Sequence, residues 1–292
     1  KCDAVGKGLT TAGRALTTTV TTPVLALGAT AIKASLDFES TFTSVRKTVD
    51  ATEAEFDALA ASSKAMSTQI AASTGEINEV MATAGQLGIH KNYLADFSRT
   101  MIDLGNSTDI VANEAASTLA KFANITNMDQ SLFGNLGATL VDLGNKFATT
   151  ESSIMEMSLR LAAAGHQVGL SEAQILGFAA ALSSVGIEAE MGGSAFSKAL
   201  VKMEVAAATG GEALEDFARV SGLTAEGFKS LFENDPAAAF QAFIVGLAQM
   251  DEEGISAIAT LQEIGVAEIR LRDTLLRAVN ANELFSKAQE MA

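Results

Sequence analysis

The sequence of 292 residues is 48% hydrophobic and 19% charged, a balance that excludes an intrinsically disordered chain and predicts a folded protein. A formal net charge of −15 disfavours direct binding to nucleic-acid phosphates, and the single cysteine excludes an intrachain disulfide and a Cys-rich metal site. Only 5% of the residues are aromatic, whereas 24 are Gly and two are Pro. This composition favours helices packed through small side chains, so we predict an all-α fold.

The first 36 residues differ in charge from the remainder of the chain. Their charged residues are Lys1, Asp3, Lys7, Arg14 and Lys33, so they carry a net charge of +3 and leave −18 for the other residues. Within this stretch, Ala15–Ile32 is an uncharged run of 18 residues, the length at which a membrane span is first considered, but its six Thr lower the hydropathy. We expect a semi-apolar helix pair, kinked at Pro23, that is buried against sister chains or able to enter a bilayer. Because the sequence begins with Lys, we also expect an excerpt of a longer polypeptide.

A short amphipathic stripe follows in residues 37–49. Its apolar members are spaced by 4, 3 and 4 residues and are Phe38, Phe42, Val45 and Val49. This spacing is typical of a helix whose apolar face contacts a partner helix, as in a coiled coil. The stripe covers fewer than two heptads, so it fits both a packed helix within one chain and a seam between copies. We predict these four residues as an oligomer or partner interface, within an N-terminal helical segment of residues 1–50.

Residues 51–292 are predicted to form a helical module with recognisable helix starts. Capping boxes, in which a Ser or Thr and a Glu or Gln three residues later exchange hydrogen bonds with the backbone, mark four of these starts. They are Thr52 with Glu55, Ser73 with Glu76, Ser171 with Gln174, and Thr209 with Glu212. A fifth start is Asp235 before Pro236, where Asp is the cap and Pro takes the first helical position.

A period near 40 residues runs through the middle of this module. Two segments share the motif Asp-Leu-Gly-Asn and a third has similar spacing, so that Gly105, Gly144 and Gly186 lie 39 and 42 residues apart. The period predicts helical hairpins in which each of these glycines ends one helix as a C-cap, stacked into a multi-helical, multimeric array. The repeat-like units lie near residues 90–125, 130–165 and 171–207. The alternative is that amphipathic helices punctuated by Gly resemble one another by chance.

The sequence contains no recognisable catalytic or metal-binding pattern. His90 and His166 are the only histidines, and neither has a second ligand at helical spacing. We expect both to lie at helix ends. The acidic run Asp251–Glu253 is interpreted as a solvated charge run, and the pair Gly192–Gly193 does not follow a strand as a phosphate-binding loop would. The sequence therefore predicts no catalytic, cofactor-binding or metal-binding residue, and we do not expect an enzyme.

Three segments, in order, give the chain a resemblance to a known family. The first is the apolar lead into the helix that contains Asp37–Glu39, and the second is the Gly-Ile and Gly-Gly-Ser-Ala hairpin at Gly186–Ala195. The third is Asp-Pro-Ala-Ala at residues 235–238, followed by the pattern Arg-Leu-Arg-Asp-Thr-Leu-Leu. Together they resemble the conserved region of bacteriophage tail tape measure proteins. The likeness covers most of the chain and is weakest in residues 87–135.

The resemblance implies a structural virion protein that lies in the tail tube lumen or at the tail tip. It implies roles in tail assembly, in length determination and in genome ejection at infection. The implied partners are copies of the same chain, tail tube proteins, distal tail-tip proteins, tail assembly chaperones and, on ejection, the host membrane. Assembly would take place in the host cytoplasm. Some members of the family carry a cell-wall hydrolase domain, for which this chain has no matching motif.

The glycine content distinguishes this region from a measuring rod. A ruler is expected to be a long, continuous and charge-rich heptad helix, whereas here a Gly falls about every 12 residues. We therefore expect a compact helical module beside the ruler. The alternative is a membrane-active, pore-forming helical protein acting on the host envelope, which the cationic N-terminal stretch and the abundant small residues would suit. An enzyme of unrecognised type is disfavoured by the poor histidine and cysteine content.

Overall fold

The computed structural model describes residues 22–252, 255–266, 269–279 and 281–291 of the chain. Within these ranges the protein consists of α-helices and one short 3-10 helix, with no strand, which confirms the predicted all-α fold. The chain divides into two compact units, Lys1–Ala82 and Thr83–Ala292. The predictions for residues 1–21, including the helix before Pro23, lie outside the described residues.

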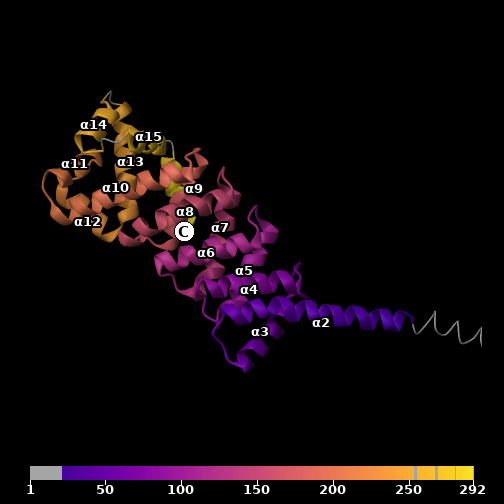
Figure 1. Ribbon diagram of the computed structural model, residues 1–292. Coiled ribbons are helices and arrows are strands. Elements are labelled where there is room, and N and C mark those ends of the chain that lie inside the picture. Colours follow the sequence, from indigo (N-terminus) through magenta and orange to yellow (C-terminus); the bar gives the residue numbers. More distant parts are fainter. Residues whose placement is uncertain (1–21, 253–254, 267–268, 280, 292) are drawn as a thin grey trace, which may run out of the picture. The chain divides into compact units, whose positions relative to one another are not determined.

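The first unit contains one long helix and two shorter ones (Figure 1). They are α2 (Thr22–Thr48), α3 (Glu53–Met66) and α4 (Thr74–Gln86), the last of which continues beyond the unit boundary. Pro23 lies in the first turn of α2, where its missing N–H needs no partner. The 27 residues of α2 form one continuous helix, whereas the sequence analysis separated the apolar run from the amphipathic stripe.

A buried asparagine connects the three helices of the first unit. Asn78 on α4 is fully buried, and its side-chain oxygen accepts a hydrogen bond from the hydroxyl of Ser63 on α3 at 2.7 Å. Its side-chain nitrogen donates to the hydroxyl of Thr41 on α2 at 2.9 Å. Because a buried amide is costly without partners, this pairing fixes the register of the three helices.

Four of the five predicted helix starts are confirmed. The capping boxes at Thr52 and Ser171 have both of their hydrogen bonds, and so does the box at Ser73 before α4. The carboxylate of Asp235 accepts from the backbone N–H of Ala238 at 3.0 Å. These starts were predictable because a cap uses only residues within one turn of the helix.

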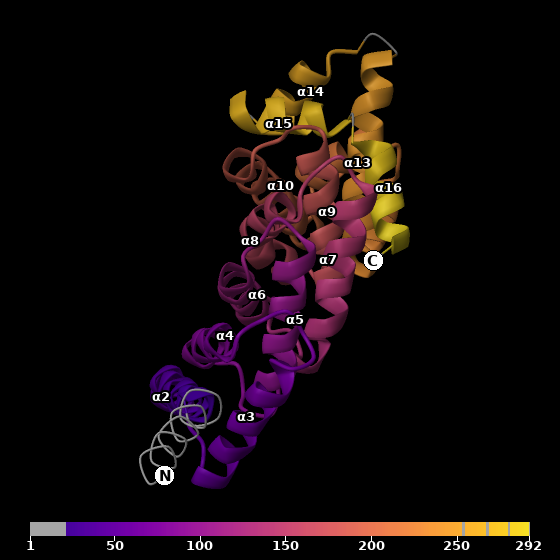
Figure 2. The same cartoon turned by 90° about the vertical axis from the view of Figure 1, so that its right-hand side faces the viewer.

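The second unit begins with three successive helix pairs arranged in two layers (Figure 2). In chain order the pairs are α5 (Leu94–Ser107) with α6 (Ala112–Thr126), α7 (Phe133–Lys146) with α8 (Glu151–Gln167), and α9 (Glu172–Ser184) with α10 (Ala189–Thr209). The first two pairs pack together, whereas α9 and α10 both pack on α8. A short 3-10 helix, η2 (Gln130–Leu132), precedes α7. Helices α5, α7 and α9 lie side by side in one layer, and α6, α8 and α10 lie side by side in the other.

The C-terminal helices close one end of this array. They are α11 (Glu212–Val220), α12 (Ala225–Asn234), α13 (Pro236–Glu252), α14 (Ala257–Glu263), α15 (Ile269–Val279) and α16 (Asn282–Met291). Helix α16 extends the first layer beside α9, and α15 extends the second beside α10. Four phenylalanines from α9, α10, α13 and α16 form the core there, with ring centroids 4.8–6.3 Å apart. They are Phe178, Phe196, Phe240 and Phe285.

Two of the three glycines predicted to end helices lie inside them. Gly105 is in the last turn of α5 and Gly144 in the last turn of α7, so the C-cap prediction is wrong at both. A Cβ on Gly105 would lie 2.9 Å from the Cβ of Ala112, at the start of the next helix, and one on Gly144 would collide with the Glu151 carboxylate. Gly186 instead follows α9 with a φ of 73°. Close approach of the backbone therefore requires glycine at Gly105, whereas at Gly144 the nearest atoms belong to the flexible side chain of Glu151.

The predicted capping box at Thr209 is also wrong. Helix α10 continues through Thr209, whose hydroxyl donates to the carbonyl oxygen of Val205 at 2.7 Å. The chain then turns through Gly210 and Gly211, with φ values of 70° and 72°, so Gly211 becomes the N-cap of α11. Only Gly adopts two successive positive φ values at low cost, and this requirement outweighs the local capping motif.

Candidate functional surfaces

The predicted interface stripe faces the interior of the first unit. Phe38, Phe42 and Val45 are buried, whereas Val49, just after the end of α2, is half-buried. The Phe42 ring meets that of Phe56 on α3 edge to face, with centroids 6.4 Å apart. The stripe thus contacts a helix of the same chain, which is one of the two arrangements that its spacing fits. A role of these four residues in self-association stays a prediction.

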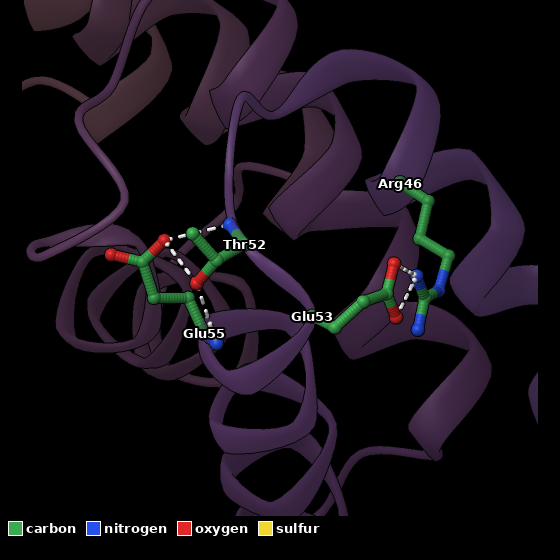
Figure 3. A network of polar contacts seen from close by, with 4 residues as sticks. All are labelled: Arg46, Thr52, Glu53 and Glu55. Atoms are coloured by element: carbon green, nitrogen blue, oxygen red, sulfur yellow. Dashed lines mark hydrogen bonds and ion pairs between the residues drawn. The ribbon is translucent and has the colours of Figure 1, made fainter.

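Charged side chains surround this contact (Figure 3). The guanidinium of Arg46 lies 4.7 Å from the centroid of the Phe56 ring, and one of its nitrogens is 2.9 Å from each carboxylate oxygen of Glu53. The capping box of Thr52 and Glu55 lies beside this ion pair. An exposed ion pair contributes less than about 1 kcal/mol, so its main effect is to cover the aromatic ring with a hydrated group.

Hydrogen bonds link the turns of the three helix pairs in the second unit. Asp109, between α5 and α6, accepts from the backbone N–H of Ser152 at the start of α8 at 3.1 Å and from its hydroxyl at 2.5 Å. Thr149, between α7 and α8, donates to the hydroxyl of Ser183 near the end of α9 at 2.8 Å. Partial burial raises the pKa of Asp109, but the hydrogen bonds from Ser152 outweigh this effect and lower it overall. The ionised carboxylate of Asp109 therefore caps a helix of the next pair.

An open groove of about 450 Å³ lies between α5 and α7. Its lining from α5 is Thr100, Asp103, Leu104 and Ser107, and its lining from α7 is Gly134, Gly137, Ala138, Val141, Asp142 and Asn145. Three of the six residues on the α7 side are Gly or Ala. The only charged groups of the lining are two carboxylates, so the groove combines a small-residue floor with an acidic rim. It is referred to below as the α5–α7 groove.

A second cavity, of about 410 Å³, lies at the turn between α9 and α10. Its lining includes the carboxylates of Glu156, Glu188 and Glu190 and no cationic side chain. Within the described ranges, no group of three His, Cys, Asp or Glu residues is placed so that it could hold a metal ion. This cavity is therefore an acidic part of the surface.

The structure does not bring the two histidines together with other reactive groups. His90 lies in the connection between α4 and α5. Its ring Nδ1 accepts a hydrogen bond from the backbone N–H of Asn92 at 3.3 Å, and its backbone N–H donates to the side-chain oxygen of Gln130 at 2.8 Å. His166 is exposed in the last turn of α8. Neither residue lines the cavities described above. Among the described residues, no helix has both the length and the hydropathy needed to cross a bilayer.

Sequence reasoning missed the groove and the linked turns. One signal was available for the groove, since Gly134, Gly137 and Ala138 have the spacing of one helix face. No comparable signal existed for Asp109 and Ser152, which are 43 residues apart and become neighbours only through the packing of two helix pairs.

The fold and its surfaces define a class: an all-helical protein built from layered helix pairs that exposes a groove and acidic turns. The chain belongs to the phage-related minor tail protein family, whose conserved region matches residues 60–263. By family, the chain is therefore a component of the phage tail, and this family is structural. The resemblance to phage tail tape measure proteins that was inferred from the sequence is confirmed. No solved structure matches the chain.

Two relatives carry more specific names. The probable tape measure protein of Halomonas phage phiHAP-1 is 26% identical over 201 residues, which cover 63% of this chain and 23% of the relative. The tape measure protein of Pneumococcus phage Dp-1 is 22% identical over 201 residues, which cover 68% of this chain and 17% of the relative. The chain thus spans about a fifth of the length of the curated relatives it matches.

Proposed function

We propose that this chain is a structural module of a phage tail tape measure protein. It lies inside the tail tube, takes part in tail assembly and length determination, and leaves the tail at infection. The observation that carries the proposal is the family match over residues 60–263, together with the similarity to two proteins named as tape measure proteins. The layered helix pairs support a role beside the measuring helix, because a chain that folds back repeatedly converts little of its length into axial distance.

The same proposal specifies partners. Family membership implies tail partners, and the positions inside the tube and at its tip call for tail tube proteins, distal tail proteins, assembly chaperones and other copies of the chain. The acidic surface of the second unit suits partners with basic surfaces, since complementary potentials favour correct association. The predicted interface stripe would contribute to contact between copies only through Val49, because its other three members are buried.

We also propose that the three helix pairs are copies of one unit, near residues 90–125, 130–165 and 171–207. Each pair is preceded by a residue with positive φ at Gly88, Asn127 or Gly169. These positions lie 39 and 42 residues apart, the same intervals that separate Gly105, Gly144 and Gly186. The two series of positions have the same intervals. This agreement supports duplication of one unit, because unrelated helices would have no reason to repeat these intervals.

The experiment that tests the tail function is quantitative mass spectrometry of purified virions before and after triggered DNA ejection. The chain is expected in complete particles and in isolated tails assembled without heads, and is expected to be lost after ejection. The tail tube protein, which remains in place, is the internal control. Retention of the chain in tails that have released their DNA would contradict its ejection, and its absence from complete particles would contradict a role in the virion.

A further inference from the structure

The α5–α7 groove is open because α7 presents glycine where other helices present side chains. A Cβ added to Gly137 would lie 2.9 Å from Cγ2 of Thr100, so close helix contact explains this glycine. A Cβ added to Gly134 would have no described atom within 4 Å, and Ala138 is exposed beside it. Glycine in the middle of a helix is less favourable than Ala by about 0.5–1 kcal/mol, and Gly134, in the first turn of α7, carries a cost at or below the lower end of this range. Contacts within the described chain do not offset this cost at Gly134.

The floor of the groove suits a segment that is itself rich in small residues. Small side chains on two facing segments allow their backbones to approach closely and to gain many van der Waals contacts. A volume of about 450 Å³ accommodates several small side chains.

The rim of the groove selects for positive charge. Asp103 and Asp142 are the only charged residues of the lining. Each has a cation on its own helix, Arg99 at 3.9 Å and Lys146 at 2.7 Å, but the carboxylates are 55% and 46% exposed. Exposed pairs of this kind contribute little, so both carboxylates can exchange these partners for a cation that enters the groove.

We propose that the α5–α7 groove is the docking site for residues 1–21 of a neighbouring copy of the chain. This segment contains Lys1, Lys7 and Arg14 against Asp3, a net charge of +2. Twelve of its 21 residues are Gly, Ala or Thr, so it has the small side chains that the floor requires. The stretch of 36 residues to which it belongs carries net positive charge in a chain of net charge −15, which makes it the complement of the acidic rim.

We assign residues 1–21 to a neighbouring copy on the basis of the long helix that follows them. Residues 1–21 precede Thr22, the first residue of a continuous helix of 27 residues. At about 1.5 Å per residue, this helix is about 40 Å long, and its buried residues Phe38, Phe42 and Val45 lie about 24 to 35 Å from Thr22 along its axis. In Figure 1, α2 extends well past α3. Docking of each segment into the next chain is a head-to-tail contact, which builds rings or filaments of copies.

The only native cysteine, Cys2, lies in the proposed segment and permits a direct test by disulfide cross-linking. The intact chain is mixed with the double variant Cys2→Ser, Ala138→Cys, which carries its thiol in the groove. The matched control is Cys2→Ser, Ala208→Cys, since Ala208 is also an exposed alanine in a helix, on α10. Disulfide-linked heterodimers are expected to form about tenfold faster with the groove thiol, because docking raises the effective concentration of Cys2.

Equal rates for Ala138→Cys and Ala208→Cys would overturn the docking site. The single variant Ala138→Cys, which retains Cys2, distinguishes the source of the segment. If it forms its disulfide only within one chain, seen as a monomer of altered mobility, the neighbouring-copy assignment is wrong.

A charge exchange provides an independent test by sedimentation of the full chain. Asp103→Arg and Arg14→Glu are each expected to weaken self-association about tenfold, and the double variant is expected to recover most of it. Gly134→Leu should block the groove without changing the circular dichroism spectrum or lowering the melting temperature, because its side chain enters open space. Normal association of all three single variants would contradict the proposal.

Discussion

Two helix junctions in the second unit use glycine in opposite ways. Where α10 packs on α8, a Cβ on Gly193 would collide with the Cβ of Arg160, and a Cβ on Gly192 would lie 3.0 Å from Cε of Met157. Where α7 packs on α5, Gly137 is in contact but Gly134 faces open space. The first junction is closed by protein atoms, whereas the second leaves the α5–α7 groove. A glycine within a helix therefore indicates that another group can approach the helix backbone closely. At Gly193 that group is α8 of the same chain, whereas at Gly134 the space is open to a partner.

The largest effect is expected from a deletion that removes the junction between α5 and α7. Deletion of residues 106–144 from the phage protein excises α6 and most of α7, so α5 loses the helices on which it packs. We expect few or no tails, or tails of normal length that fail to deliver DNA, because packing surface rather than axial distance is lost. Electron microscopy of the tails measures both outcomes.

A second mutant phage carrying Ala208→Ser, at an exposed position of α10 outside the groove, is the control and should make normal tails. Intact tails from the deletion mutant that are shorter by about 1.5 Å for each deleted residue would show that this region is an extended ruler.

The closed junction is tested by Gly193→Ala. The added methyl group collides with the β-carbon of Arg160, which is fixed to the backbone and cannot move aside as a side-chain end could. Helices α8 and α10 must separate, and we expect a loss of about 1–3 kcal/mol in the free energy of unfolding. Urea denaturation of the purified chain measures the change. A neutral result would mean that this junction is as tolerant as the α5–α7 groove.

A hydrogen bond between helix pairs is tested by Asp109→Asn. The pKa of Asp109 is lower in the folded protein than in the unfolded chain. Its ionised carboxylate therefore stabilises the fold above about pH 4, the usual pKa of Asp. This stabilisation is lost as the pH falls through the lower pKa of the folded state. We expect the variant to be less stable by about 0.5–1 kcal/mol at pH 7, because a cap on α8 is lost from an exposed site.

The check is a pair of urea denaturation curves for native and Asp109→Asn chains at pH 7 and near pH 3. The difference between them should shrink at the lower pH. A difference that stayed constant or grew would show that the carboxylate charge is not responsible.

The smallest effect is expected for Gly134→Ala at the open junction. The methyl group meets no described atom within 4 Å, and Ala favours the helix over Gly, so the free energy of unfolding should rise by about 0.5 kcal/mol. The measurement is again urea denaturation. Destabilisation by more than about 1 kcal/mol would show that this position is filled in the folded chain.

Features that depend on one turn of helix were predictable from the sequence. The capping boxes at Thr52, Ser73 and Ser171 and the Asp235 cap are local, since the groups that exchange hydrogen bonds lie within three residues of one another. The all-α class followed from composition and from glycine spacing. Where local rules competed, as at Thr209, the requirement of the following glycines for positive φ prevailed.

The sequence by itself also indicated family membership, through an ordered series of helix motifs, and the two named relatives are 26% and 22% identical to it over 201 residues. Only the tertiary structure decided which face of each helix is covered. It packed Phe42 against the chain's own α3, assigned Gly105 and Gly144 to the last turns of helices, and placed Asp109 beside Ser152 of the next pair. The physical reason is that helix formation depends on neighbours within a turn, whereas burial and groove formation depend on residues about 40 positions apart that meet only when successive pairs pack.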